Sequence, residues 1–332
     1  MKYTTLILAL CLSLSSILYA EDNTSQQLSP FQITVAYPLA THGSESLHYT
    51  NMLSLNWFYG LNGGVKGLEL GTLFNYNAQD VMGLQWAGIT NINGGDSKGV
   101  ILSGVTNIGY GRYTGLFLSG ILNYSRKGLT GVAAAPVNIN TSEVEGLQLG
   151  VFNYTKNLKG VQFGLVNYVE NADKGLPIGL VNIVKDGYMG VENVSGEVIY
   201  TSLILKVGME RYYTSYKFGL TQNDHQILYV TGLGIGRNVT LSDTQKLSID
   251  LSVNQIHESS TIHESLNLLH KLDLNYKRKI INNLSFLLGP SLNFYVYDEK
   301  LIRVPYSFGT WDLGDNKANM WIGMNTGIGY SF

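Results

Sequence analysis

The stretch GVQFGLVNY, residues 160–168, decides the fold because it is one of eight copies of the same short unit. Every copy opens with a glycine and closes on an asparagine, and successive copies begin 14 to 16 residues apart. A near-constant period of this kind indicates an architecture built by repeating one small structural unit. The opening glycines are Gly67, Gly83, Gly99, Gly115, Gly131, Gly146, Gly160 and Gly175, and the closing asparagines are Asn75, Asn91, Asn107, Asn123, Asn138, Asn153, Asn167 and Asn182.

The repeated unit is predicted to be a strand and a turn. In the copy quoted above, Val161, Phe163 and Leu165 fall on one face of an extended chain, while smaller or polar residues fall on the other. The segments between copies, such as 93–98 and 171–174, are polar and too short to hold a helix. The sequence therefore predicts an all-β chain.

The copies have two lengths. The closing asparagine follows the opening glycine by eight residues in the first four copies and by seven in the last four. Because one residue reverses the alternation of faces in a strand, we expect the longer copies to absorb it near their midpoint, in a β-bulge or a tight corner. The midpoint positions are Thr72, Gly88, Gly104 and Gly120, and for the three glycines this structural role is favoured over ligand binding.

Two architectures fit such a repeat. In the favoured one, the chain is an outer-membrane antiparallel β-barrel, and each of the eight strand-turn units supplies one tilted wall strand of about 9 to 11 residues. In the alternative, a smaller barrel carries the repeat as a β-solenoid, in which each copy is one coil and the asparagines stack as a hydrogen-bonded ladder. The low charge favours the barrel, whereas the identical polarity of every copy favours the solenoid. The asparagines could equally line a lumen or simply end the strands.

The composition is that of an outer-membrane barrel. Only 14% of the residues are charged, below the roughly 25% of ordinary soluble proteins, and the 332 residues include 38 glycines and 22 tyrosines. The net charge of −2 gives no electrostatic reason to expect a nucleic-acid partner. After residue 20 no run of 18 apolar residues occurs, so any membrane crossing is predicted to use strands.

The first 20 residues are predicted to be a secretory signal peptide. Lys2 supplies its positive region, residues 6–18 form a short apolar stretch, and Ala20 precedes the predicted cut. Export by this signal, together with the strand pattern, predicts the cell outer membrane as the location. The only cysteine, Cys11, lies inside this segment, so the mature protein is expected to have no disulfide, thiol nucleophile or thiolate metal ligand.

Both flanks of the repeat are predicted to form barrel strands. We expect an N-terminal polar segment with the first barrel strands at 21–64, the repeat region at 65–190, and a C-terminal β-meander that closes the barrel at 191–332. The chain ends on Phe332, and a terminal aromatic residue on an amphipathic strand is typical of outer-membrane barrels. The expected partners are therefore outer-membrane lipid and the barrel-insertion machinery, which would recognise this last strand. The expected strands are 31–39, 51–59, 202–212, 226–237, 246–255, 265–276, 284–297 and 320–332, with the long polar loop 298–317 outside the barrel.

The segment SLNWFYGLNGGVKGLELGTLFN at 54–75, followed by GLQWAGITN at 83–91, resembles the surface-repeat family of bacterial outer-membrane proteins, whose copies follow the pattern G-[LV]-Q-x-[AG]-G-x-x-N. The match covers residues 31 to about 190 well and the meander after it more loosely. The resemblance implies a surface or outer-membrane location and no established activity. Several copies replace the glutamine, which weakens the idea that it is a required ligand contact; the replacing residues are Glu69, Ile101, Phe117, Ala133 and Pro177.

No pattern in the chain points to an enzyme, and we predict no catalytic, cofactor-binding or metal-ligating residue. The dipeptides His257-Glu258 and His263-Glu264 repeat, but they lie in a polar stretch where a metal site is not favoured. The stretch GLGIG at 232–236 matches part of a dinucleotide fingerprint, yet it alternates as a barrel strand and no helix follows it. None of the histidines forms a zinc-protease pair at helical spacing; they are His42, His48, His225, His257, His263 and His270.

The favoured function is an outer-membrane barrel with a structural, surface or passive-pore role and an unknown ligand. The alternative is a surface adhesin or scaffold whose solenoid repeat is presented by a smaller barrel. A hydrolase housed in a barrel would need a serine, a histidine and an acid together at one rim, and the sequence offers only scattered candidates.

Overall fold

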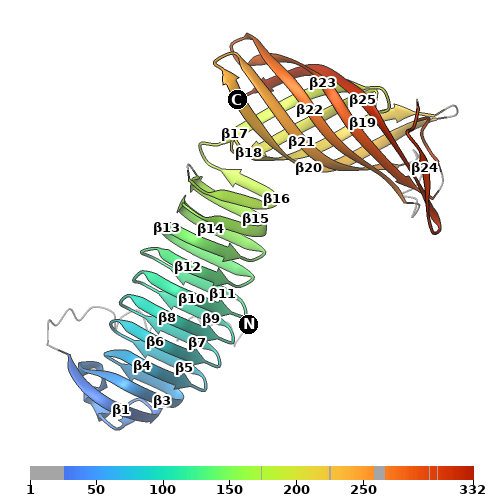
Figure 1. Ribbon diagram of the computed structural model, residues 1–332. Coiled ribbons are helices and arrows are strands. Elements are labelled where there is room, and N and C mark those ends of the chain that lie inside the picture. The colour runs from blue at the N-terminus through green and yellow to red at the C-terminus, as the bar shows by residue number, and fades with distance from the viewer. Residues whose placement is uncertain (1–25, 173, 224–225, 258–265, 299, 305) are drawn as a thin grey trace, which may run out of the picture.

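The computed structural model describes residues 26–332, apart from 173, 224–225, 258–265, 299 and 305. The described chain has two parts, a long parallel β-solenoid and, after it, a closed antiparallel barrel (Figure 1). The all-β class is therefore confirmed, and so is the combination of a barrel with an internal repeat. The predicted signal peptide at 1–20 lies outside the described residues and stays a prediction.

In the solenoid, most copies of the repeat form one coil of two short strands that meet at a corner. Strands of neighbouring coils pair in parallel and in register, so that Gly83 pairs with Gly99 and Asn91 with Asn107. Each coil therefore stacks directly on the one before it. The first strands of the early coils are β4 (Gly64–Gly71), β6 (Val81–Ala87), β8 (Ser97–Ser103), β10 (Tyr113–Ser119) and β12 (Leu129–Ala134), and the second strands are β5 (Phe74–Asn77), β7 (Thr90–Asn93), β9 (Thr106–Gly109) and β11 (Leu122–Ser125). The later coils are made by the longer strands β13 (Val137–Leu149), β14 (Phe152–Leu158), β15 (Val161–Asn171) and β16 (Leu176–Val184).

The repeat is the solenoid of the alternative architecture, and its placement as wall strands of the barrel is wrong. Consecutive strands of an antiparallel barrel run in opposite directions, so equivalent residues of successive copies would not meet in register along a barrel wall. The identical polarity of all eight copies is the sequence signal that separates the two architectures. A parallel stack brings every copy into the same environment, which is why the copies look alike.

The N-terminal segment extends the solenoid and does not enter the barrel. β1 (Gln27–Ala36) pairs in parallel with β3 (Tyr49–Asn62), which in turn pairs with the first repeat strands. The expectation that 21–64 holds the first barrel strands is therefore wrong, because Asn56 of β3 joins the asparagines of the repeat in one buried stack. Two short elements connect these strands, β2 (Leu39–Ala40) and the 3-10 helix η2 (Gly43–His48).

The opening glycines are required by the stacked backbones. Gly115 has a φ of 129°, in the left-handed region that favours glycine. A Cβ at this position would lie 2.1 Å from the carbonyl oxygen of Gly99 in the preceding coil. The repeated glycine therefore lets one coil approach the next.

The longer copies take up their extra residue at the corner, as predicted. Leu118 pairs with Ala134, and Leu122 pairs with Val137 in the next coil. Three residues of the longer copy thus lie opposite two of the shorter one. The corner is tight, because a Cβ on Gly120 would lie 2.1 Å from the carbonyl oxygen of the equivalent glycine one coil earlier.

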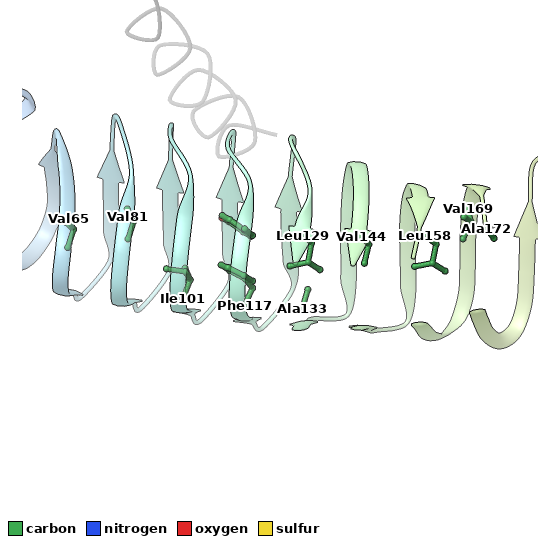
Figure 2. Close-up of a cluster of buried hydrophobic side chains, with 11 residues drawn as sticks. Val65, Val81, Ile101, Phe117, Leu129, Ala133, Val144, Leu158, Val169 and Ala172 are labelled. Atoms are coloured by element: carbon green, nitrogen blue, oxygen red, sulfur yellow. The ribbon is translucent and has the colours of Figure 1, made fainter. Parts of the chain in front are cut away.

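A narrow apolar column runs inside the coils. Figure 2 shows its side chains pointing into the solenoid from successive coils, mostly at two positions of the repeat. One position is that of Val65, Val81 and Leu129; the other, held by Ile101, Phe117 and Ala133, is occupied by Glu69 and Gln85 in the first coils. The rings of Tyr113 and Phe117 stack within it, with their centroids 4.0 Å apart. The column is narrow because polar side chains occupy the rest of the interior. Its members are Val65, Val81, Ile101, Tyr113, Phe117, Leu129, Ala133, Val144, Leu158, Val169 and Ala172.

The barrel has eight antiparallel strands and closes because its first strand, β17 (Tyr188–Gly196), pairs with its last, β25 (Asn316–Ser331). The expected C-terminal meander is therefore present, although it begins at Tyr188, inside the range assigned to the repeat. A ninth strand, β24 (Thr310–Leu313), pairs with β25 beside this ring. The other barrel strands are β18 (Thr201–Gly208), β19 (Tyr213–Gln222), β20 (Ile227–Ser242), β21 (Gln245–His257), β22 (Asn267–Ile281) and β23 (Leu284–Tyr297).

Barrel strands alternate between an exposed apolar side chain and a buried polar one. In β21, Leu251 and Val253 point outward and are exposed, whereas Asp250 and Ser252 point inward and are buried. The glycines of 232–236 belong to β20 and face inward, against residues such as Asn254. The prediction that this stretch is a barrel strand with small inward residues is confirmed.

Candidate functional site

The closing asparagines form a continuous hydrogen-bonded ladder inside the solenoid. Each Nδ2 donates to the Oδ1 of the equivalent asparagine in the next coil, and the N···O distances from Asn56 to Asn182 are 2.8 to 3.1 Å. Asn153 and Asn167 in this ladder are completely buried. Of the three roles that the sequence left open for these residues, the ladder is the one the structure has.

The ladder continues from the solenoid into the barrel. The Nδ2 of Asn182, the last asparagine of the stack, donates to the hydroxyl of Thr214 on β19 at 2.6 Å. Thr214 projects outward from the barrel wall and is nevertheless buried, because the last coil covers it. The two parts of the chain are thus joined by packing and hydrogen bonding as well as by the peptide chain.

Glu69 lies in a second polar column beside the ladder. It is completely buried, and its carboxylate accepts hydrogen bonds from four side-chain amides. The donors to Oε1 are Asn56 at 3.0 Å and Asn62 at 2.6 Å, and the donors to Oε2 are Asn77 at 2.7 Å and Gln85 at 2.8 Å. Later coils place Gln148 and Gln162 in the same column, joined by a 2.7 Å hydrogen bond.

Burial raises the pKa of Glu69 from 4.5 to about 7, against the opposing effect of the four amide donors. Its neighbours in the column are neutral amides, so no cation balances the carboxylate there. Sequence reasoning noted Glu69 only as a departure from glutamine. The role of Glu69 follows from its position on the inward face of the coil. The sequence pattern did not show which face of the strand points inward.

The barrel interior contains a network of ion pairs that spans the lumen. Lys206 on β18 lies 2.9 Å from Glu192 on β17 and 3.1 Å from Asp250 on β21. Lys217 on β19 lies 3.2 Å from Asp273 on β22, on the other side of the barrel. All of these side chains are less than one tenth exposed. Charges from facing walls therefore fill the middle of the lumen.

The end of the barrel farther from the solenoid is filled by a second group of side chains. Residues of two connecting segments, including Ile199 and Leu301, pack against inward-facing strand residues in one buried apolar cluster. Trp321 is completely buried in it, and its indole nitrogen donates to Glu197 at 2.7 Å. The two layers together, ionic in the middle and apolar at this end, close the lumen.

Two cavities lie where the solenoid meets the barrel. One, of about 590 Å³, is lined by charged residues of the solenoid turns, such as Glu170 and Asp186, and by Arg211 and Phe332 of the barrel. The other, of about 410 Å³, is lined mostly by apolar residues of the last coil and of the barrel's outer wall. Its apolar lining includes Leu176, Ile178, Ile235, Ile249 and Leu251.

Two of the histidines that the structure describes make separate hydrogen bonds. His257 is hydrogen bonded to Thr231 through Nε2 at 2.9 Å, and His42 to Gln32 through Nδ1 at 3.1 Å. His225, His263, Glu258 and Glu264 lie outside the described residues. Within the described part of the chain, no group of three or more histidine, cysteine, aspartate or glutamate side chains could hold a metal ion. Nor does that part contain a helix long and apolar enough to cross a membrane.

Comparison with protein-family models, with curated proteins and with solved structures finds no match to this chain. The candidate sites therefore rest on the chain's own geometry.

Proposed function

We propose that this chain is an outer-membrane protein in which the eight-strand barrel is a closed anchor and the β-solenoid is the element that it holds. The observation that carries the proposal is the direction of alternation in the barrel. Exposed leucine, isoleucine and phenylalanine side chains face outward, and lysine, aspartate and glutamate face inward. Water would favour the reverse arrangement, whereas lipid favours this one.

The outer wall is apolar on strand after strand. Phe218 on β19, Ile235 on β20 and Leu251 on β21 are each more than half exposed. A soluble protein would leave this contiguous surface in water at a cost of about 25 cal/mol for each Å². In a bilayer the same side chains contact acyl chains, and the backbone polar groups are paired around the closed ring.

The lengths of the connections between barrel strands support one orientation of the barrel in the outer membrane. At the end beside the solenoid they are tight, as between β20 and β21 and between β22 and β23. At the other end they are longer, above all between β23 and β25, where β24 is inserted. Outer-membrane barrels have short periplasmic turns and long extracellular loops. The solenoid then lies on the periplasmic side, and the surface-exposed part is the loop end that carries Trp311.

The filled lumen favours an anchor over a passive pore. The ion pairs of Lys206 and Lys217 cross the barrel, and the cluster around Trp321 occupies the loop end. That the chain has no enzymatic activity stays a prediction. Its contact with outer-membrane lipid and the recognition of its last strand by the insertion machinery also stay predictions. Phe332, which ends that strand, donates its backbone N–H to the carbonyl of Met189 on the first strand at 2.9 Å.

The test is fractionation of cells that express the full chain, combined with surface labelling. We expect the protein in the outer membrane, with a gel mobility that changes on boiling because a folded barrel resists detergent. In a Cys11→Ser background, Asp312→Cys at the loop end should react with an impermeant maleimide on whole cells. Asp96→Cys in a solenoid turn should react only after the outer membrane is opened.

Recovery of the protein in the soluble fraction, without a heat-dependent shift, would contradict the membrane anchor. Labelling of Asp96→Cys on whole cells would keep the anchor but reverse the orientation and favour the surface-adhesin alternative.

A further inference from the structure

We infer that the β-solenoid lies in the plane of the membrane, with its apolar faces among the acyl chains of the periplasmic leaflet and its charged edge at the headgroups. This inference rests on the proposed membrane location of the barrel. It assigns a lipid-binding surface to the repeat, for which the sequence suggested only wall strands or an exposed adhesin.

The first observation is the distribution of charge along the repeat. From opening glycine to closing asparagine, the eight copies contain a single charged residue, Glu69, and that side chain is buried. The other charged residues of 71–187 fall between the copies, in the turns, as Asp96 and Arg126 do, or at the adjoining ends of strands, as Lys156 does. Because the coils stack in register, these turns form one charged edge along the solenoid.

The second observation is that the solenoid buries polar side chains beside its apolar column and exposes large apolar side chains on its outside. The asparagine ladder and Glu69 are buried, while Trp86 and Phe163 on the strand faces and Ile121 and Leu165 at the corners are 44 to 58% exposed. Hydrophobic burial should place these side chains inside if the coil were surrounded by water. The same inversion characterises the barrel wall, so the two parts are built for the same surroundings.

The third observation is how the last coil lies against the barrel. At the charged edge, Asp186 shares a cavity with the turn residue Arg211 and with Phe332. Further along β19, Asn182 bonds Thr214, and at the corner the carbonyl of Leu180 accepts a hydrogen bond from the hydroxyl of Tyr216. The charged edge therefore lies beside the end of the barrel that has the tight turns between strands. The apolar corner lies beside the outer wall of the barrel, which the proposal places in lipid.

The dimensions of a coil fit one leaflet with its headgroup region. At about 3.3 Å per residue, the outward apolar residues of a coil span about 23 Å from Met82 on β6 to Ile89 at the corner. One leaflet is about 20 to 22 Å thick with its headgroups, of which about 15 Å is hydrocarbon, so the corner lies among the acyl chains and the Met82 end reaches the headgroups. The tyrosines that follow the asparagines, such as Tyr154 and Tyr168, lie nearer the charged edge, where aromatic residues favour the membrane interface.

Acyl chains fit this surface better than a second copy of the chain does. Apolar side chains cover both strand faces and the corner between them, whereas a protein partner docked on one face would leave the others in water. The mostly apolar cavity between Ile178 of the last coil and Leu251 of the barrel makes the two outer surfaces continuous. Pairing between neighbouring coils satisfies the backbone within the stack, as a lipid environment requires.

The test uses the full chain in a Cys11→Ser background, reconstituted in phosphatidylcholine vesicles that contain lipid with a nitroxide on the acyl chain. A fluorescent label is placed by Leu165→Cys at the apolar corner, by Lys156→Cys at the charged edge as its matched control, and by Leu220→Cys on the barrel wall as a positive control. We expect acyl nitroxide to quench the labels at 165 and 220 to a comparable fraction. The label at 156 should instead be quenched by an aqueous quencher.

The outcomes separate this inference from the proposal on which it rests. If the label at 220 is quenched by acyl nitroxide but the label at 165 by the aqueous quencher, the in-plane solenoid is wrong and the barrel anchor stands. If neither is reached by acyl nitroxide, the membrane anchor itself fails. If the label at 165 is shielded from both quenchers and Leu165→Cys chains cross-link to each other, a second copy covers the surface and the lipid assignment is wrong.

Discussion

At the scale of single residues, Glu69 shows that polar side chains inside the coils allow a carboxyl group to be buried without a cation beside it. An isolated carboxylate in an apolar interior is strongly disfavoured, but Glu69 accepts hydrogen bonds from four amides of the first coils. Glutamine at the equivalent positions of later coils shows that the column tolerates a neutral side chain of the same size. Glu69 therefore makes the N-terminal coils the pH-sensitive part of the solenoid.

We expect the N-terminal coils to lose stability as the pH rises from about 4.5 to about 7. The folded chain keeps the proton of Glu69 up to a pKa of about 7, whereas the unfolded chain releases it near 4.5. Between these values the folded state binds more protons, so raising the pH favours unfolding, by at most about 3 kcal/mol over the whole window. Guanidinium unfolding of the full chain in detergent, followed through the fluorescence of Trp57 and Trp86, measures this change.

Glu69→Gln should remove this loss of stability across the window. Glu145→Gln, which changes an exposed glutamate of the same solenoid, is the matched control and should keep the wild-type slope. A wild-type slope in Glu69→Gln would show that another group titrates there.

At the scale of the coil, the sequence predicted the strand-turn unit, its glycines and the corner that absorbs the extra residue. It did not decide between barrel and solenoid, because both give strands of alternating character. An outward apolar face with an inward Gln162 looks the same in a lipid-facing barrel strand as in this solenoid. The low charge favoured wall strands, because barrel strands were the lipid-facing elements among the alternatives.

The ladder is the property of the coil stack that mutation can test most directly. Asn153→Ala and Asn167→Ala should each lower the unfolding free energy by about 1 to 3 kcal/mol, because each leaves buried partners without a hydrogen bond. Asn157→Ala, which changes an exposed asparagine near the end of β14, is the control and should change little. Guanidinium titration gives the global effect, and hydrogen exchange of β14 and β15 gives the local one. Unchanged exchange in the double variant Asn153→Ala/Asn167→Ala would mean that the ladder adds nothing to stability.

At the scale of the whole molecule, the sequence located most of the barrel and missed two of its strands. The expected strand 202–212 ran on past the end of β18, and neither β17 nor β19 was foreseen. β17 carries Glu192 in the lumen, and β19 carries Lys217, as other barrel strands carry inward charges. Their apolar pattern is weaker because a polar residue stands on the outward face, Asn193 on β17 and Thr214 on β19. The ion pairs that stabilise these charges join strands far apart in the sequence, and no local pattern reports them.

The closed lumen leads to the last prediction, which concerns conductance. In planar bilayers the wild-type chain should show no sustained channel. The pair Lys217–Asp273 crosses the barrel, and the cluster around Trp321 fills its loop end. Combining Trp321→Ala with Lys217→Ser, Lys271→Ser and Asp273→Ser should open a measurable ionic current, and the heat-dependent gel shift checks that this variant still folds. Lys271 is included because it is buried 3.7 Å from Asp273, and a single unpaired buried charge would destabilise the barrel by about 3 to 5 kcal/mol.

The control for this experiment is Ile322→Ala, which changes the outward residue beside Trp321 and should stay closed. A steady wild-type current equal to that of the four-substitution variant would instead make the barrel a pore, since the same side chains would then have to leave a path for ions. The solenoid would in that case lie beside a conducting barrel, and the ion pairs that cross the lumen would select among the permeating ions.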